Sequence, residues 1–372
     1  MILNRTLSKY FRTQARGACC TRQFGTENLN ASSRVEKLRE VLKSEDEASS
    51  SKGTKKTLPK PPWLKAQIPS GEAYEKIRKG VKDLNLATVC QEAKCPNIGE
   101  CWSGGEGHVA TATIMIMGEA CTRACSFCAV KTLRKPPPLD PDEPQKVSEA
   151  VLQWDGIEYI VITSVTRDDL DDQGAAHFAR TAALLKQQVV PSSRGAKSPL
   201  LVECLTPDFH GEPALVKSVV DSGLDVFAHN IETVERLQGR VRDRRASYAR
   251  SITVLKTAKD VGRCSFPDAG FQRTNDLLTK TSIMLGLGET DAEVAQTLRD
   301  LSEAQVDIVT LGQYLKPSKY HMSVQEYITP EKFQHWHDVA VGQYGFKYVA
   351  SGPLVRSSYR AGELFVKGLL AK

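Results

Sequence analysis

Residues 113–128 read TIMIMGEACTRACSFC, a short apolar run followed by three closely spaced cysteines. The apolar run predicts a buried strand, and Cys121, Cys125 and Cys128 follow it in a C-x3-C-x2-C arrangement. Cysteine thiolates are the usual ligands of iron-sulfur clusters, and a 4Fe-4S cluster with three protein ligands keeps one iron open, as catalytic metal sites do. Zinc is the alternative, although structural zinc sites favour paired knuckles with a fourth Cys or His.

A second triplet precedes the first. Cys90, Cys95 and Cys101 are spaced C-x4-C-x5-C within TVCQEAKCPNIGECW, so six of the ten cysteines fall in residues 90–128. Disulfides are the alternative, but each triplet has an odd number of cysteines and intracellular proteins keep their thiols reduced. The second triplet therefore predicts a second cluster, whose fourth ligand would come from elsewhere in the chain.

Beyond residue 110, apolar strand-like runs alternate with helical patterns. Strands are predicted at residues 111–117, 159–163, 200–205, 225–229, 282–287 and 308–313, and helices at residues 175–188, 214–222, 246–260 and 291–304. Thr290 and Glu293 have capping-box spacing, and Thr329-Pro330 opens another helix. Repeated strand-helix units imply a parallel sheet covered by helices. The predicted fold class is α/β, a partial (β/α)6 TIM-like barrel with extensions at both ends.

The two triplets, taken with Arg356-Ser357-Ser358-Tyr359, make the chain resemble the lipoyl synthases of the radical S-adenosylmethionine (SAM) superfamily. Further stretches stand in the order of that family: PPWLK (61–65), CPNIGECW (95–102), VECLTPDF (202–209), GLDVFAHNIETV (223–234), KTSIMLGLGE (280–289), LGQYL (311–315) and ASGPLVRSSYRAGE (350–363). The resemblance covers about residues 58–370 and implies the radical SAM barrel. It also implies that Ser358 is a hydroxyl ligand of the auxiliary cluster, where an ordinary surface serine is the alternative.

The resemblance implies an activity with two 4Fe-4S clusters and SAM. The cluster on Cys121, Cys125 and Cys128 would reduce SAM to a 5′-deoxyadenosyl radical, which abstracts hydrogen from C6 and C8 of a protein-bound octanoyl-lysine. Sulfur would come from the auxiliary cluster, held by Cys90, Cys95, Cys101 and Ser358. Saturated C–H bonds have no acidic proton, so this chemistry belongs to cofactors rather than to side chains.

Polar residues and glycines stand where the predicted strands end. Active sites of βα barrels gather at the C-terminal ends of the strands, so these residues are the expected SAM contacts: Thr163, Ser164, Glu203, Asn230, Glu232, Gly286 and Gln313. Tight turns explain glycines equally well, and a loop hydrogen bond explains Asn230. His229 is expected to be a satisfied core histidine, and His321 to face the active-site mouth.

The implied substrates are octanoylated lipoyl-carrier domains, namely the E2 subunits of 2-oxoacid dehydrogenases and the glycine cleavage H protein. A ferredoxin-type reductant and iron-sulfur carrier proteins are the other implied partners. The net charge does not indicate nucleic-acid binding. Five of the 50 basic residues precede the first acid, Glu27, and the rest of the chain carries 45 basic and 44 acidic residues. No apolar run approaches the roughly 20 residues of a membrane span.

The N-terminal segment is arginine-bearing, hydroxyl-containing and free of acids, which predicts a mitochondrial transit peptide at residues 1–30 and a matrix location. A disordered basic tail is the alternative. A flexible segment is expected at 31–57, followed by an extension with the auxiliary cysteines at 58–109, the barrel at 110–320 and a C-terminal extension at 321–372. Two rival functions stay open: another radical SAM sulfur-inserting enzyme, and a non-catalytic iron-sulfur or zinc protein.

Overall fold

The computed structural model describes most of the chain beyond residue 57, in the following ranges: 58–65, 71–83, 87–92, 95, 97–103, 112–154, 157–191, 197–263 and 276–358. The chain divides into two units, residues 1–56 and 57–372. All described residues belong to the second unit. The transit peptide expected at 1–30 and the segment expected at 31–57 lie outside the described residues.

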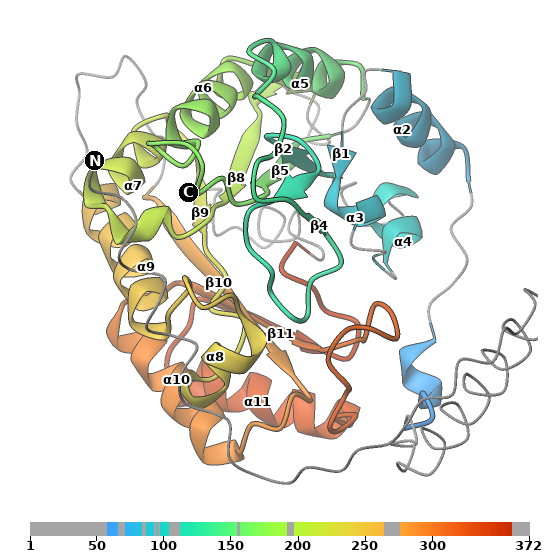
Figure 1. Ribbon diagram of the computed structural model, residues 1–372, viewed down its shortest axis with the longest axis vertical. Helices are drawn as coiled ribbons and strands as arrows, with labels where there is room; N and C mark the ends of the chain where they lie inside the picture. The colour runs from blue at the N-terminus through green and yellow to red at the C-terminus, as the bar shows by residue number, and fades with distance from the viewer. Residues whose placement is uncertain are drawn as a thin grey trace, which may run out of the picture. The chain divides into compact units, whose positions relative to one another are not determined.

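An eight-stranded sheet curves into an open barrel (Figure 1). In sheet order its strands are β1 (Ala87–Thr88), β2 (Ala112–Ile116), β5 (Tyr159–Ser164), β8 (Leu201–Leu205), β9 (Val226–Ala228), β10 (Leu278–Leu285), β11 (Ile308–Gln313) and β12 (Tyr348–Gly352). Every neighbouring pair from β2 to β12 is parallel, whereas β1 joins β2 in the antiparallel direction. The predicted partial α/β barrel is confirmed.

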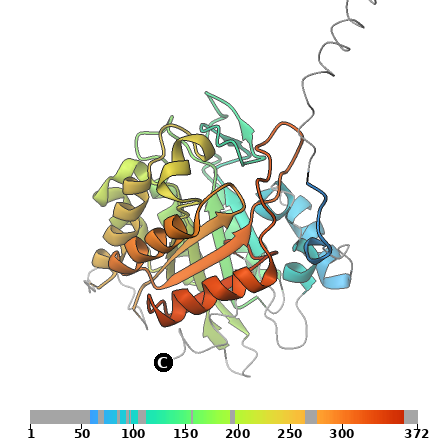
Figure 2. The same cartoon turned by 90° about the horizontal axis from the view of Figure 1, so that it is seen from below.

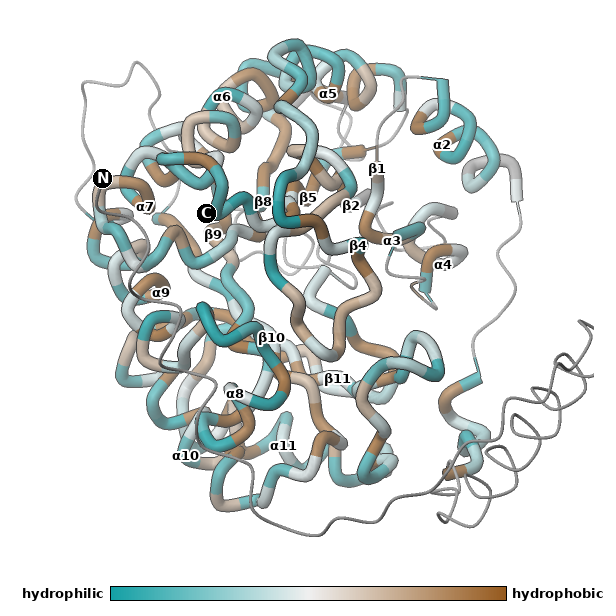
Figure 3. Tube along the Cα trace, viewed as in Figure 1, coloured by the Kyte–Doolittle hydropathy of each residue, from teal (hydrophilic) through white to brown (hydrophobic). Residues whose placement is uncertain are grey.

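Helices surround the outside of this sheet (Figure 1). They are α5 (Glu143–Leu152), α6 (Ala175–Lys186), α7 (Pro213–Val220), α9 (Tyr248–Arg263), α10 (Asp291–Glu303) and α11 (Pro330–Gly342). Hydrophobic residues concentrate on the strands, and hydrophilic ones on the outer sides of the helices (Figure 3). The predicted helix starts are confirmed, because Thr290 forms a capping box with Glu293 and Thr329 accepts a hydrogen bond from the Lys332 N–H.

The observed sheet is larger than the predicted one. β1 and β12 are short and were not predicted, and β10 begins at Leu278 rather than at residue 282. The first half of β10 is polar, which hides its strand character in the sequence. Inside the barrel these polar groups have partners: Lys280 Nζ lies 2.9 Å from both carboxylate oxygens of Glu203, and the Thr279 N–H donates to Asp307 at 2.8 Å.

A hydrophobic layer closes the N-terminal end of the barrel. The first residues of five parallel strands pack there with Val161, which follows in β5: Tyr159, Leu201, Val226, Leu278 and Ile308. All six side chains are at most 8% exposed. Because this end is filled, the opposite end, where the strands terminate, is the one that can hold a ligand.

Short elements complete the described unit. Near the open side of the barrel lie η1 (Pro62–Leu64), α2 (Glu72–Asp83), α3 (Val89–Glu92) and α4 (Ile98–Ser103). Two small ribbons are formed by β3 (Ala120–Cys121) with β4 (Lys131–Thr132) and by β6 (Val189–Pro191) with β7 (Lys197–Pro199). The remaining turns are η2 (Phe209–Gly211), η3 (Glu235–Leu237) and α8 (Gln238–Val241). No helix among the described residues is long and apolar enough to span a membrane.

Candidate active site

The C-terminal ends of the strands border a cavity of about 520 Å³. Its wall includes the six cysteines of both triplets and the serine of the C-terminal motif: Cys90, Cys95, Cys101, Cys121, Cys125, Cys128 and Ser358. Within the described residues, no three His, Cys, Asp or Glu side chains already close around a single metal position. The thiols are instead distributed along the wall of one cavity, which contains the sulfur donors that iron-sulfur clusters use.

The first triplet lies on a loop that turns sharply out of β2. Met117 and Gly118 both have positive φ, 68° and 83°, and the Met117 N–H donates to Glu143 Oε2 at 2.7 Å. The pairing of β3 with β4 then closes the base of the loop that carries Cys125 and Cys128. The sharp turn redirects the chain from the strand across the end of the barrel.

Backbone N–H groups point at two sulfurs of this triplet. The N–H groups of Arg123 and Thr166 donate to Cys121 Sγ at 3.3 and 3.4 Å, and the Asp243 N–H donates to Cys125 Sγ at 3.3 Å. Hydrogen bonds to a charged acceptor are stronger than neutral ones. These donors orient the two sulfurs; at Cys125 the bond from Asp243 opposes the burial that raises the pKa of the thiol.

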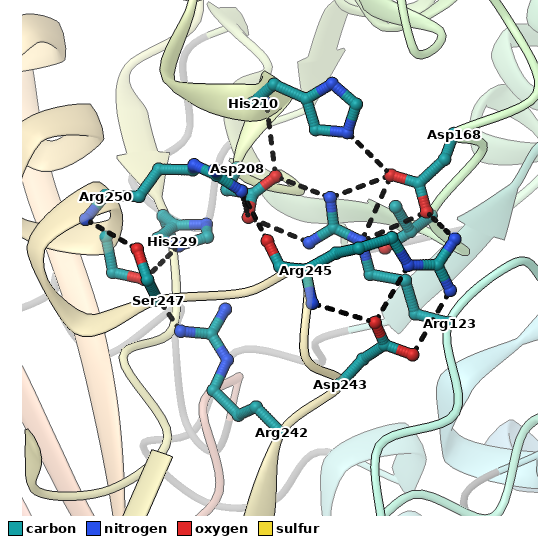
Figure 4. A network of polar contacts seen from close by, with 12 residues as sticks. Arg123, Asp168, Asp208, His210, His229, Arg242, Asp243, Arg245, Ser247 and Arg250 are labelled. Atoms are coloured by element: carbon teal, nitrogen blue, oxygen red, sulfur yellow. Dashed lines mark hydrogen bonds and ion pairs between the residues drawn. The ribbon is translucent and has the colours of Figure 1, made fainter. Parts of the chain in front are cut away.

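A buried network of charges holds the loop against the barrel (Figure 4). The Arg123 guanidinium donates to both oxygens of Asp208 at 2.8 Å and to Asp168 at 2.8 Å, and Thr122 Oγ1 donates to Asp168 at 2.7 Å. Burial alone would raise the pKa of Asp208, but the hydrogen bonds from Arg123 hold that pKa well below its ordinary value. Arg123 itself is only 6% exposed. The network was not predicted from the sequence.

A second part of the network holds the next residue of the loop. Asp243 accepts a hydrogen bond from the Ala124 N–H at 2.9 Å and forms an ion pair with Arg245 at 2.8 Å. Arg245 also donates to the Thr122 carbonyl at 2.7 Å and lies 3.0 Å from Asp168 (Figure 4). The carboxylates on both sides of the loop thus share their cationic partners.

The auxiliary triplet is held mainly by backbone hydrogen bonds among the residues that the structure describes. Cys90 lies in α3 and Cys101 in α4, and Cys95 stands between them. Backbone hydrogen bonds join Cys95 N–H to the Cys90 carbonyl at 3.0 Å and Cys101 N–H to the Asn97 carbonyl at 2.9 Å. Asn97 Nδ2 also donates to the Leu354 carbonyl at 2.5 Å. This last bond ties the triplet to the turn that carries the C-terminal motif.

The C-terminal turn reaches the cavity because β11 contains a glycine where the turn crosses it. A Cβ on Gly312 would lie 2.1 Å from the Val355 carbonyl oxygen, so no other residue fits without movement. Arg356 Nη1 donates to the Val355 carbonyl at 2.6 Å, and Ser358 follows on the cavity wall. Gly312 lies within the LGQYL stretch, but the sequence gives no sign of this contact.

The thiols of Cys90 and Cys128 lie in surroundings that disfavour the charged thiolate form. Burial raises the pKa of Cys90 to about 12, with a further contribution from Cys95, against hydrogen bonding from Thr113, which lowers it. Burial likewise raises the pKa of Cys128 to about 12, with contributions from Cys125 and Cys121. A bound cation offsets such a cost, because a coordinating thiol is deprotonated by its metal. The donor set and its burial therefore fit iron-sulfur ligation.

Five of the seven expected SAM contacts line the cavity: Thr163, Ser164, Asn230, Glu232 and Gln313. Ser164 Oγ is buried and has no hydrogen-bond partner among the described atoms. Burial raises the pKa of the Glu232 carboxyl, against the nearby Arg242 and a hydrogen bond from Asn230, which lower it. Gln313 donates to the backbone carbonyls of Leu285, Tyr314 and Glu326, so its amide positions the loop after β11.

The other two expected contacts lie elsewhere and are removed from the candidate set. Glu203 is fully buried inside the barrel, where Tyr159 donates to it at 2.6 Å and Lys280 at 2.9 Å. Gly286 has a φ of 92°, and its N–H donates to Glu289 at 2.5 Å. Glu203 therefore has a structural role, and Gly286 forms a tight turn.

The two histidines considered in the sequence lie near the cluster loop. His229 is 2% exposed, with Nδ1 3.0 Å from the Thr206 carbonyl and Nε2 2.9 Å from Ser251 Oγ, as expected for a satisfied core histidine. His321 Nε2 lies 2.9 Å from the Cys128 carbonyl. His321 therefore supports the backbone of the first triplet rather than standing free at the mouth.

Family comparisons agree with this geometry. The model of the radical SAM superfamily matches residues 115–301, which include the first triplet and strands β5, β8, β9 and β10. The chain is thus a radical SAM protein. The model of the N-terminal domain of lipoyl synthase matches residues 23–95, and full-length relatives narrow the class further.

The chain is 58% identical to lipoyl synthase 1, mitochondrial, of Phaeodactylum tricornutum, over 85% of this chain and 77% of that relative. It is 56% identical to the mitochondrial lipoyl synthase of Branchiostoma floridae, over 85% and 78%. It is 52% identical to that of Danio rerio, over 94% and 80%. Among solved structures, methylornithine synthase aligns with a TM-score of 0.46 at 14% identity, over 76% of this chain and 72% of that chain.

The chain belongs to the lipoyl synthase family. Its function is that of a lipoyl synthase, an enzyme that uses SAM and a 4Fe-4S cluster. The relatives are mitochondrial, which confirms the predicted location. The comparison therefore favours lipoyl synthase over the two rival functions, another radical SAM sulfur-inserting enzyme and a non-catalytic iron-sulfur or zinc protein.

Proposed function

We propose that the chain carries two iron-sulfur clusters in one cavity and uses the second as the sulfur donor. The cluster that binds SAM is held by Cys121, Cys125 and Cys128. The auxiliary cluster is held by Cys90, Cys95, Cys101 and Ser358. The observation that supports this division is the shared cavity of about 520 Å³, whose wall includes both triplets and Ser358. A substrate in that cavity lies within reach of both.

Bound clusters supply electron transfer and sulfur, which no side chain here offers. The chain's own residues hold and orient the ligands. Backbone N–H groups of Arg123, Thr166 and Asp243 donate to the sulfurs of Cys121 and Cys125 and fix their orientation. Because a hydroxyl is a harder and more replaceable ligand than a thiolate, the Ser358 oxygen is suited to an iron that must leave when sulfur is transferred.

Five residues are proposed to bind SAM: Thr163, Ser164, Asn230, Glu232 and Gln313. Ser164 contributes a buried hydroxyl that has no partner among the described atoms, so it can hydrogen-bond an incoming ligand. Asn230 and Glu232 place an amide and a carboxyl on the same wall. The carboxyl oxygens suit the amino or ribose hydroxyl groups of SAM.

The proposed reaction inserts sulfur at C6 and C8 of an octanoyl-lysine on a lipoyl-carrier domain. The cavity wall offers apolar surface for an acyl chain from Met115, Leu205, Ile283 and Val355. The proposed carriers are the E2 subunits of 2-oxoacid dehydrogenases and the glycine cleavage H protein. A ferredoxin-type reductant supplies electrons, and iron-sulfur carrier proteins restore the consumed cluster.

The proposed domain organisation follows from the division of the ligands between the two proposed clusters. An extension at residues 58–109 brings the auxiliary cysteines, the barrel at 110–320 brings the first triplet and the SAM contacts, and an extension at 321–372 brings Ser358. The hydrogen bond from Asn97 to the Leu354 carbonyl joins the two extensions. Neither extension could form the auxiliary site alone.

The test uses anaerobically reconstituted protein with dithionite, SAM and an octanoylated carrier peptide, with product mass, iron and sulfide measured. The wild-type protein is expected to replace two hydrogens of the peptide by two sulfurs. Cys125→Ala should abolish SAM cleavage. Cys95→Ala should retain SAM cleavage, contain about half the iron and form no thiolated product. Thiolated product from Cys95→Ala would disprove the assignment of the sulfur donor.

A further inference from the structure

Three loop segments at the active-site end of the barrel are strongly basic. Segments 131–139, 240–245 and 315–322 together contain nine Lys and Arg residues and one acid, Asp243. Two of the nine are engaged inside the fold, since Arg242 donates to Ser251 Oγ at 2.7 Å and Arg245 pairs with Asp243 at 2.8 Å. The other seven form a group that we call the basic rim: Lys131, Arg134, Lys135, Arg240, Arg244, Lys316 and Lys319.

All three segments are attached to the cluster loop, which places the basic rim around the cavity. The Leu133 N–H donates to the Cys121 carbonyl at 2.9 Å, and Ser126 Oγ donates to the Arg240 carbonyl at 2.6 Å. The third segment contacts the loop through His321, and Lys316 itself lines the cavity. The β4 loop and the α8 segment project from the same edge of the barrel (Figure 2).

The charges of the basic rim are not neutralised by the chain. Six of the seven side chains are exposed and Lys316 is partly buried; within the part of the chain that the structure describes, none has a carboxylate partner. Some exposed cations elsewhere on the barrel do have carboxylate partners, as in Lys256 with Asp260 at 2.9 Å and Arg236 with Glu293 at 2.5 Å. Beyond the first acid, Glu27, the chain has almost equal numbers of both signs. The basic rim therefore brings seven positive charges to the cavity mouth of a chain that is otherwise close to neutral.

We propose that the basic rim is the docking surface for an acidic face of the carrier protein that presents the acyl-lysine. This inference rests on the proposed function, because a substrate attached to a protein must bring that protein to the mouth. A charged rim around a cleft steers and orients a partner of opposite sign. Tyr320, 85% exposed with Lys319 5.1 Å from its ring, adds an aromatic contact of the kind that anchors protein interfaces.

The reductant protein is the competing occupant of this surface. An acyl-lysine has to pass through the mouth that the rim surrounds, whereas an electron donor has no need to enter the cavity. The carrier is therefore the partner that the position of the charges favours. Dithionite as the electron source removes the reductant protein from the assay and separates the two.

The test is a charge reversal at three exposed rim residues that do not line the cavity, Arg134→Glu/Lys135→Glu/Lys319→Glu. Reconstituted holoenzyme is assayed with dithionite on two substrates, the octanoylated carrier domain and an uncharged octanoyl-lysine tripeptide. The KM for the carrier domain should rise about tenfold or more at low salt, with kcat unchanged. The KM for the tripeptide should stay the same, and added salt should reduce the difference from wild type.

A matched control reverses three exposed charges on the outer helices α9 and α10, Lys256→Glu/Arg263→Glu/Arg299→Glu. It changes net charge by the same amount and should leave both KM values near wild type. An equal rise in the control would show that bulk charge governs the affinity, and would overturn the proposal. The milder Arg134→Gln/Lys135→Gln/Lys319→Gln variant should give a smaller rise in the same direction.

The two substrates distinguish failure of this proposal from failure of the proposed function. If wild type gains no sulfur on either substrate, the proposed function is wrong. If wild type converts both and the rim variant keeps a normal KM for the carrier domain, the docking surface is wrong. The docking surface is also wrong if only the KM for a ferredoxin-type reductant rises when that protein replaces dithionite.

Discussion

The two cysteine triplets face one cavity but are held in different ways. The loop with Cys121, Cys125 and Cys128 is fixed by a buried charge network in which Arg123 joins two carboxylates (Figure 4). The auxiliary triplet lies on and between two short helices, and a side-chain hydrogen bond from Asn97 links it to the C-terminal turn. The difference matches the roles that we propose for the two sites.

A cluster that only transfers electrons needs ligands that stay in place through every turnover. A cluster that gives up its sulfur must be dismantled and rebuilt, so its ligands have to release iron and accept a new cluster. The short helices of the auxiliary triplet pack through apolar contacts of Cys90 and Trp102, and such contacts are non-directional, so they can re-form after a small displacement. A buried ion-pair network cannot move without leaving charges unpaired.

The largest effect is expected from removing the cation at the centre of the network. Arg123→Met leaves the Asp168 and Asp208 carboxylates without their main partner inside the protein. Loss of one member of a buried ion pair costs about 3–5 kcal/mol. The free energy of unfolding of the apo-protein, measured in denaturant, should fall by that amount, and iron binding at the first triplet should fall with it.

Arg78→Met is the matched control, since Arg78 pairs with Glu75 at 3.3 Å on the exposed surface of α2. Such pairs contribute about 0–1 kcal/mol, so little change is expected. If Arg123→Met instead loses iron from the auxiliary site first, the contrast between the two sites is wrong.

Much of this arrangement was predictable from local sequence. Apolar runs placed six parallel strands, and cysteine spacing placed both triplets. The network was not predictable, because Arg123 and Asp208 are 85 residues apart and only the closed barrel brings them together. The burial of Glu203 was not predictable for the same reason: its partner Lys280 lies 77 residues later, and a pair of opposite charges inside a barrel looks, in sequence, like two separate polar residues.

The second largest effect is a pH dependence next to the network. Burial lowers the pKa of His229 to about 4, with Arg242 adding to the effect, so the folded state keeps the ring neutral. Its contribution to stability is fully present above the ordinary pKa of about 6.5 and is lost as pH falls toward 4, up to about 3 kcal/mol. Unfolding measured at pH 7, 6 and 5 should show this loss. The free energy of unfolding should change less with pH in His229→Gln than in the wild type. Equal pH dependence in both proteins would show that His229 is not the titrating group.

A smaller effect, confined to the auxiliary site, is expected from Gly312→Ala. The added Cβ would meet the Val355 carbonyl at 2.1 Å and displace the turn that carries Ser358. Overpacking of this kind costs about 1–3 kcal/mol. Iron content should fall toward one cluster while SAM cleavage continues. Gly342→Ala is the control, since nothing lies within 4 Å of a Cβ there; if both variants keep full iron, the turn does not hold the auxiliary cluster.

The smallest effect is expected from Asn97→Ala, which removes the hydrogen bond from Asn97 Nδ2 to the Leu354 carbonyl. One such bond contributes about 1 kcal/mol to stability, so the fold should persist. The bond nevertheless joins the two segments that supply auxiliary ligands, and its loss should speed iron release from that site to a chelator. Iron at the first triplet should be released at the wild-type rate. If Asn97→Ala accelerates iron release equally at both sites, the two triplets are not held independently. The charge network would then not protect the first triplet from movements of the second.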